Sequence, residues 1–365
     1  MRLERLTPHL GARVTGVDLA GVGRGAREEL RALLETHLVL FFADQSLDPP
    51  AFRRLGEAMG ELEVTPLLPS LGGDLAELHY VEAARDQPRG TFADRWHTDV
   101  PFRERPPYGA ILKPEVLPSI GGDTIWASMY AAYEALPDSL RRLADELQAV
   151  HTSPNPNAPE WCVHPVVRVN PATGRRGLYV SRMYATRIVG LTDAESRQLL
   201  ELFFNHAAAP DFQVRWRWSP DIVAMWDNRF TQHYAVADYA ERRRMLRLTL
   251  NGDRPIGIQD YRAPPVRIGD DRLALAPIEA RLRQRLAVSQ VCLFGGPDAT
   301  EIHVIIETPA PIGMDRLTAA LRGELSGSPR AQVHYAARLA RDDQGQVDRA
   351  AAMAQAMARL SPPSN

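Results

Sequence analysis

A histidine and an aspartate stand one residue apart in the segment WHTDVPF, residues 96–102. If this segment is a β-strand, His97 and Asp99 point to the same face, because alternate residues of a strand share a face. An imidazole and a carboxylate on one face are two ligands of a 2-His-1-carboxylate site, which suits non-haem Fe(II). A solvated strand face can carry the same pair, so a metal site requires a third ligand.

The third ligand is expected to be a histidine on a distant strand of the same sheet, and the chain has 10 histidines. His233, in WDNRFTQHYAVADY, follows a strand-like run and is surrounded by aromatic residues. The alternatives are His151, His164 and His206.

Two arginines follow His233 in the segment ERRRMLRLTL. Arg243 and Arg247 are four residues apart, so on a strand they share a face. Arginine binds carboxylates through two parallel hydrogen bonds, and two convergent arginines near iron fit a dianionic 2-oxoacid co-substrate. Arg242 and Arg244 are interpreted as a solvated charge cluster.

Four segments resemble, in order and spacing, the taurine/alkylsulfate dioxygenases, which depend on Fe(II) and 2-oxoglutarate. These segments are WHTDVPFRERPPYGAIL, GGDTIWAS, WDNRFTQHYAVADY and RLTLNGDRP, and the likeness covers about residues 5–255. The resemblance implies a mainly β fold, with a double-stranded β-helix (jelly-roll) core and flanking helices. It implies Fe(II), 2-oxoglutarate and O2 as cofactors, with His97, Asp99 and His233 as the iron ligands.

The same resemblance assigns the co-substrate site. It implies that Thr124 and Arg243 bind the distal carboxylate of 2-oxoglutarate, and that Arg247 lies near its C1 end and near any anionic group of the substrate. Relatives that halogenate carry a small residue in place of the carboxylate of Asp99, so hydroxylation is expected, with release of succinate and CO2. Desaturation, isonitrile formation by oxidative decarboxylation and alkylsulfate cleavage are alternatives, and a non-catalytic jelly-roll binding protein is a further one.

The substrate side differs from that of the taurine-specific members. They hold the sulfonate with a His and a Tyr in an HPVY-like segment, where this chain reads TPLL with Thr65 and Leu68. A buried sulfonate without donors is costly, so taurine is not expected. We expect a small anionic substrate, such as an amino acid or a carrier-tethered acid. The predicted pocket consists of Thr65, Leu68, Val100, Phe102, Tyr184 and Arg247; Trp96, Trp126 and Trp226 are equally expected to be core residues.

The pattern of apolar runs and of Pro, Gly and Asn residues along the chain predicts two domains and a linker. Short apolar runs separated by Pro, Gly and Asn predict many strands in a dioxygenase domain over residues 1–258. Helices are predicted near its start and in SMYAAYEALPDSLRRLADELQ and TDAESRQLLELFFNHAA, the second with a capping-box pattern. A Pro- and Gly-rich linker, 259–269, precedes a small α+β module over 270–365.

This module resembles the small C-terminal subdomain of acyl-adenylate-forming enzymes. Those enzymes place a lysine in a loop that reads QGQVDR here, with Gln346 in the position of the lysine. The resemblance therefore implies a module that cannot form an adenylate and is kept for packing or docking, which suggests a role in the biosynthesis of a peptide-like natural product.

The bulk composition excludes several classes of partner. The net charge of −2 gives no electrostatic footprint for nucleic acid or an anionic membrane. No run approaches 18 apolar residues, and the start has no signal-peptide pattern. The two cysteines, Cys162 and Cys292, are expected to be free thiols in a reducing cytoplasm. A homo-oligomer is possible.

Overall fold

The computed structural model describes most of the chain as two compact units, Met1–Gly257 and Ile258–Asn365. The described residues are 1–22, 24–65, 68–83, 93–155, 159–262, 266–268, 271–273, 275–295, 301–324, 330–340, 347 and 351–352. Helix α6 (Ile258–Arg262) and strand β16 (Val266–Ile268) lie within the predicted linker, 259–269, and belong to the second unit.

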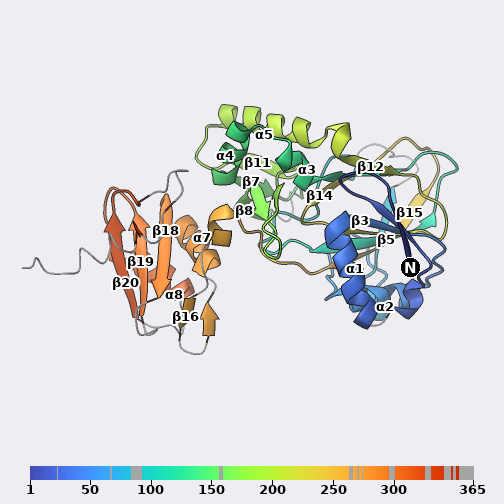
Figure 1. Ribbon diagram of the computed structural model, residues 1–365, viewed down its shortest axis with the longest axis horizontal. Coiled ribbons are helices and arrows are strands. Elements are labelled where there is room, and N and C mark those ends of the chain that lie inside the picture. Colours follow the sequence, from blue (N-terminus) through green and yellow to red (C-terminus); the bar gives the residue numbers. More distant parts are fainter. Residues whose placement is uncertain are drawn as a thin grey trace, which may run out of the picture. The chain divides into compact units, whose positions relative to one another are not determined.

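A seven-stranded sheet forms the centre of the first unit (Figure 1). Neighbouring strands in this sheet are antiparallel, except for β2 and β3, which are parallel. In sheet order, the strands are β1 (Arg2–Arg5), β2 (Ala12–Thr15), β3 (Val39–Phe42), β13 (Val223–Asp227), β5 (Gly109–Val116), β15 (Arg243–Leu250) and β4 (His79–Ala83).

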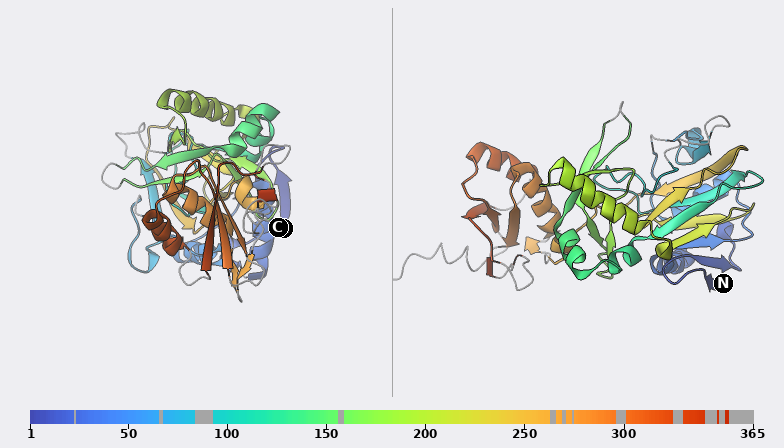
Figure 2. Two further views of the ribbon diagram at one scale, coloured as in Figure 1. Left: turned by 90° about the vertical axis from the view of Figure 1, so that its left-hand side faces the viewer. Right: turned by 90° about the horizontal axis from the view of Figure 1, so that it is seen from above.

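Two amphipathic helices cover one face of this sheet (Figures 1 and 2). They are α1 (Arg24–His37) and α2 (Pro49–Met59), as the sequence predicted. Helix α2 begins with two prolines, which fit the first turn because its N–H groups have no intrahelical acceptor, and Asp48 caps the Ala51 N–H. Leu40 and Phe42 of β3 point toward these helices.

The other face of the sheet packs against a three-stranded sheet, in the order β12 (Gln213–Trp216), β6 (Thr124–Ser128) and β14 (Thr231–Ala235). Val39 and Phe41, which alternate with the helix-facing residues of β3, join Trp126 and Trp226 in the core between the two sheets. This arrangement confirms the predicted jelly-roll class. The two sheets face each other without closing into a barrel in the described part of the chain.

The remaining strands and helices of the first unit pack around a second core. The strands are β11 (Ala185–Ile188), β7 (Gln148–Thr152) and β8 (Trp161–Pro165) in one sheet, and β10 (Arg176–Leu178) with β9 (Val167–Val169) in another. The helices are α3 (Met129–Glu134), α4 (Asp138–Glu146) and α5 (Asp193–Ala207), with short 3-10 turns at Leu19–Gly21, Gly73–Leu75 and Pro210–Phe212.

Two helix predictions have different outcomes. The capping box of α5 is present, because the Thr192 and Glu195 side chains each accept from the other's backbone N–H. The single helix predicted over residues 128–148 is wrong, since Pro137 ends it and separates α3 from α4. Proline cannot donate the helical hydrogen bond, and the residue before it is pushed out of the helical conformation.

The second unit contains a sheet of β18 (Gln290–Gly295), β19 (Glu301–Glu307) and β20 (Arg330–Ala336). Helices α7 (Leu275–Leu286) and α8 (Met314–Glu324) pack on one face of it (Figure 1). A hairpin of β16 and β17 (Asp271–Leu273) completes the described part. Gln346 and most of the C-terminal end of the predicted module lie outside the described residues.

Among the helices that the structure describes, none is both long and apolar enough to cross a membrane. Cys162 and Cys292 do not form a disulfide with each other.

Candidate metal centre

His97, Asp99 and His233 lie together, and all three are buried. One donor atom from each lies within 4.8 Å of the other two. The Nε2 atoms of His97 and His233 are 3.9 and 3.7 Å from Oδ1 of Asp99, and the two rings are 4.0 Å apart between centroids. Three donor atoms that far apart and facing one another can surround a single ion.

The segment that carries His97 and Asp99 is not a regular strand, so that part of the prediction is wrong. Only His97 pairs, in an isolated bridge with His233 whose two backbone hydrogen bonds measure 3.1 and 2.8 Å. The chain bends at Asp99, and Val100 adopts a φ of 49°. A β-branched residue in the left-handed region is strained, and such strain is typical of functional sites.

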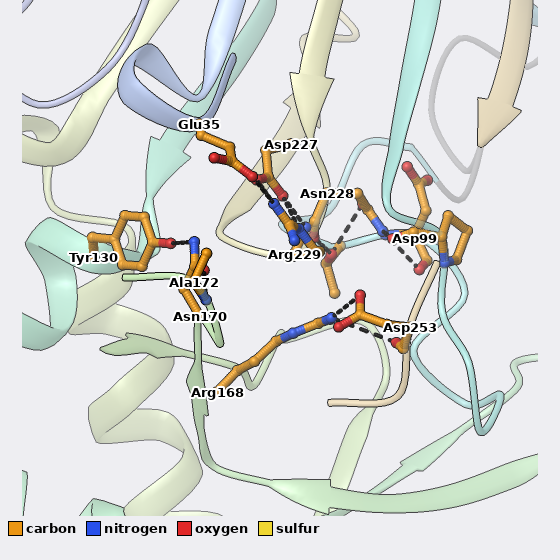
Figure 3. A network of polar contacts seen from close by, with 12 residues as sticks. Glu35, Asp99, Tyr130, Arg168, Asn170, Ala172, Asp227, Asn228, Arg229 and Asp253 are labelled. Carbon is orange, nitrogen blue, oxygen red and sulfur yellow. Dashed lines mark hydrogen bonds and ion pairs between the residues drawn. The ribbon is translucent and has the colours of Figure 1, made fainter. Parts of the chain in front are cut away.

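Asn228 holds this bend in place (Figure 3). Its Oδ1 accepts from the backbone N–H of Asp99 at 2.8 Å, and its Nδ2 donates to the carbonyl groups of Asp99 and Pro107 at 3.2 and 3.1 Å. One side chain thus replaces the strand partner that the bend lacks. Directly after it, Arg229 forms two side-chain hydrogen bonds with Asp227, which ties the loop to β13.

The protonation states suit a divalent metal. Burial lowers the pKa of both imidazoles, so His97 and His233 are neutral and keep a lone pair. Burial by itself raises the pKa of Asp99, but the charge of Arg247 and its close contact with the carboxylate oppose this, and the pKa lies well below its ordinary value. The three residues therefore present two neutral nitrogens and one carboxylate oxygen.

A hydrogen bond to the ring nitrogen that faces away from the metal group fixes the orientation of His97. Its Nδ1 lies 2.7 Å from the carbonyl oxygen of Arg95, so Nδ1 carries the proton and donates, while the lone pair is on Nε2. A ligand histidine is usually oriented by such a bond through its second nitrogen. His233 has no equivalent bond among the described residues, since its Nδ1 is buried without a partner. The donor set fits the facial triad of non-haem Fe(II).

Arg243 and Thr124 meet across the two sheets, as the resemblance implied. Arg243 donates from Nε to the carbonyl of Gly122 at 3.0 Å and from a terminal nitrogen to Oγ1 of Thr124 at 3.4 Å. Trp218 also donates to Thr124 Oγ1, at 3.0 Å. Arg243 is 5% exposed, so this buried pair offers a cation and a hydroxyl to a carboxylate.

Arg247 lies at the metal group itself. Its guanidinium is 2.7 Å from Oδ2 of Asp99 and 5.6 Å from the ring centroid of Trp226. Its Nε has no hydrogen-bond partner in the described part of the chain. The two arginines that the sequence singled out thus have separate partners, and Arg247 retains a buried donor for a bound anion.

The predicted pocket residues fall into two groups. Val100, Phe102 and Tyr184 form one apolar cluster, in which the Phe102 and Tyr184 rings are 5.5 Å apart and Tyr184 is 6.3 Å from the His97 ring. Thr65 is buried and Leu68 is half-buried, on another segment. The cluster can therefore form an apolar wall beside the metal group.

The three tryptophans considered as pocket walls are core residues. Trp126 and Trp226 pack between the two sheets, and Trp96 packs against the second core. The histidines considered as alternative ligands also lie elsewhere. His151 and His164 face each other on β7 and β8, and Nε2 of His206 donates to the Ala132 carbonyl.

Three residues beside the site were not identified from the sequence. Asn228 and Trp218 contact site residues more than 90 positions away in the chain, at Asp99 and Thr124. Glu63 pairs with Arg103, and burial raises its pKa even though Arg103 and Arg247 oppose that shift. The adjoining letters WDN were available as a signal for Asn228, but only the fold shows which backbone it braces.

Comparisons with known proteins agree with the geometry. Residues 2–249 match the model of a family described as "Taurine catabolism dioxygenase TauD, TfdA family". The chain is 36% identical to an alpha-ketoglutarate-dependent sulfate ester dioxygenase of Pseudomonas putida, over 71% of this chain and 92% of that protein. It is 34% identical to an alkylsulfatase of Acinetobacter baylyi, over 69% and 86%. A crystal structure of a taurine dioxygenase from Burkholderia xenovorans is similar with a TM-score of 0.65 and 36% identity, over 70% and 91%.

Proposed function

Because the chain belongs to the TauD/TfdA family of dioxygenases, we propose that it oxidises a C–H bond of a small organic anion. The chain is an Fe(II)- and 2-oxoglutarate-dependent dioxygenase. The observation that carries the proposal is the buried His97–Asp99–His233 group with Arg247 at its carboxylate, together with the buried pair of Arg243 and Thr124. We further propose a cytoplasmic location, which fits two cysteines that form no disulfide with each other.

In this proposal, His97, Asp99 and His233 hold Fe(II), and Arg243 with Thr124 binds the distal carboxylate of 2-oxoglutarate. When bound, iron would activate O2, which is the oxidant: one oxygen atom would enter the co-substrate, which leaves as succinate and CO2, and the other would enter the C–H bond of the substrate. The protein's own residues orient the bound molecules and shield the reacting atoms from water. Arg247 orients an anion, and the apolar wall excludes water from the reacting atoms.

A sulfate ester is the substrate class that we place first. The relatives named for sulfate ester oxidation and alkylsulfate cleavage support it. Hydroxylation at the carbon that bears the sulfate gives a product whose C–O bond to sulfate breaks, so an aldehyde and sulfate are released. Thr65 and Leu68 offer no equivalent of the His and Tyr that hold a sulfonate, and taurine is therefore not proposed.

An amino acid or a carrier-tethered acid is the second candidate. The retained C-terminal module, with its resemblance to a subdomain of acyl-adenylate-forming enzymes, favours it. Both classes present an anion to Arg247, and they differ in whether sulfate is released.

The test has two parts. Anaerobic addition of Fe(II) and 2-oxoglutarate should give the weak visible charge-transfer band of the complex, and Asp99→Ala should abolish it, whereas the exposed Asp211→Ala should not. Succinate release is then measured with alkyl sulfates, amino acids and carrier-bound acids. Binding of 2-oxoglutarate that needs no metal, or a band that survives Asp99→Ala, would contradict the proposed site.

A further inference from the structure

A second polar side chain lies beside Arg247, on the neighbouring strand. His79 of β4 is the cross-strand partner of Arg247 in the antiparallel pair β4–β15, so the two side chains lie on the same face. Val81, two residues along β4, packs into the core between the sheets, whereas Tyr80 packs toward the helices. His79 therefore points to the inside of the sandwich, next to the guanidinium.

Both neighbours have buried donors without acceptors. His79 is 0% exposed, and neither of its ring nitrogens makes a hydrogen bond of normal geometry within the described residues. The same holds for Nε of Arg247. Buried polar groups are almost always paired, because an unpaired one costs about 1–3 kcal/mol. Two such donors side by side can both donate to one bound molecule.

The charges favour an anion as that molecule. Burial, followed by the charge of Arg247, lowers the pKa of His79, so the imidazole is neutral and offers one N–H without adding a second positive charge. Backbone groups of Glu77 and Thr65 lie near the ring and oppose this shift, although neither makes a hydrogen bond of normal geometry with it. The second of these groups belongs to the segment around Thr65. This is the segment in which TPLL has no His or Tyr to hold an anionic group.

We propose that His79 and Arg247 form an anion-binding subsite, in which the imidazole N–H and the Arg247 Nε–H each donate to one oxygen of a carboxylate or sulfate. His79 thus supplies from β4 a donor that the segment around Thr65 lacks. Two molecules offer this chemistry, namely 2-oxoglutarate through its C1 carboxylate and the substrate through its anionic group. The identity of the anion rests on the proposed function, whereas the subsite itself does not.

The experiment compares two side chains of similar length. His79→Gln keeps an N–H donor and His79→Met removes it. Calorimetry under anaerobic conditions measures the affinity of the Fe(II)-loaded protein for 2-oxoglutarate, then for hexyl sulfate, with hexanol as the uncharged probe. We expect His79→Met to weaken binding of at least one anion about 10- to 100-fold, the value of a hydrogen bond to a charged group, and His79→Gln to lie within about 3-fold of wild type. Hexanol binding should not change.

Measuring both anions shows whether the subsite binds 2-oxoglutarate or the substrate. A loss confined to 2-oxoglutarate assigns the subsite to its C1 carboxylate, and a loss confined to hexyl sulfate assigns it to the substrate. Wild-type affinity for both anions in His79→Met overturns the inference. Equal losses in the Gln and Met variants also overturn it, since they show a packing role. Thermal denaturation of each variant checks folding.

His151→Met is the matched control, because His151 is also fully buried with both ring nitrogens unpartnered, but lies on β7. Its anion affinities should equal those of wild type. A wild type that forms neither the charge-transfer band nor succinate would remove the proposed function. The affinity of the metal-free protein for hexyl sulfate then still decides on His79, and equal values in wild type and His79→Met would overturn the subsite.

Discussion

At the scale of single residues, two arginines on one strand have different tasks. Arg243 is enclosed with Thr124 and Gly122, while Arg247 reaches the carboxylate of Asp99. The spacing of the two arginines was recognisable in the sequence, because both lie on one face of β15. His97 and Asp99 were recognisable only as possible metal ligands, because their segment is not a regular strand. His79 was not, because only the strand register places it beside Arg247.

Replacing Arg243 tests the co-substrate site. We expect Arg243→Lys to raise the KM for 2-oxoglutarate about 10- to 100-fold, because a lysine cannot make two parallel hydrogen bonds to a carboxylate. Steady-state succinate formation measures it. The exposed neighbour Arg242, which pairs with Glu82, provides the control, and Arg242→Lys should leave KM unchanged. The same KM in both variants would contradict the role of Arg243.

The pH dependence of stability should report on His151. Burial lowers its pKa to about 3, against an ordinary 6.5. Below pH 6.5, His151 is protonated in the unfolded chain but stays neutral in the folded protein. The stabilisation is therefore complete above pH 6.5 and is lost as the pH falls toward 3. Between pH 6 and 5, we expect the free energy of unfolding in urea to fall about 1.4 kcal/mol per unit more steeply in wild type than in His151→Met. Parallel pH profiles would contradict this.

At the scale of elements, the two-sheet core follows from alternation, whereas the metal loop does not. The runs that predicted strands form β3, β5, β13 and β15, because their alternate residues pack on helices and on the second sheet. The segment with His97 and Asp99 departs from strand geometry. The Asp99 N–H bonds to the side chain of Asn228, which is 129 residues away in sequence, instead of to a neighbouring strand. Local pattern carries no information about a bond of that kind.

Asn228 should therefore matter beyond its size. Asn228→Ala removes four hydrogen bonds, one of them from the Thr98 hydroxyl, and leaves the buried N–H of Asp99 unpaired, which should lower the free energy of unfolding by about 2–4 kcal/mol. Urea denaturation measures the loss, and an Fe(II) titration should show weaker binding because Asp99 is no longer held. A matched control is Asn205→Ala, at an exposed asparagine that pairs with Arg182 on the surface. An equal stability change in both variants would show that Asn228 does not brace the loop.

At the scale of the whole molecule, every residue proposed for chemistry lies in the first unit, Met1–Gly257, which has its own cores. The second unit has a separate core, in which α7 and α8 cover one sheet. Its mixture of helices and strands was predictable because those segments have their own apolar periods, whereas α6 and β16 were not, since they fall in the Pro- and Gly-rich segment predicted as a linker. Its role was not, because a resemblance at the level of a subdomain names no partner.

Residues 1–257 expressed alone should fold cooperatively and keep the charge-transfer band with Fe(II) and 2-oxoglutarate. The physical reason is that no residue of the proposed site comes from the second unit. The comparison of interest is succinate release on free against carrier-bound acids, with the full chain as control. A loss restricted to carrier-bound acids would support docking by the second unit, and equal turnover would remove that idea. Failure of residues 1–257 to fold would contradict the independence of the first unit.

The backbone of Val100 has a consequence for engineering. A valine at φ 49° stores about 1–3 kcal/mol of strain, so a screen that selects variants for heat resistance should favour Gly or Asn at this position. The same residue directly follows Asp99 and belongs to the apolar wall. A variant stabilised in this way should resist heat better but turn over more slowly, because relaxing the bend loosens the Asp99 carboxylate that the bend holds in place.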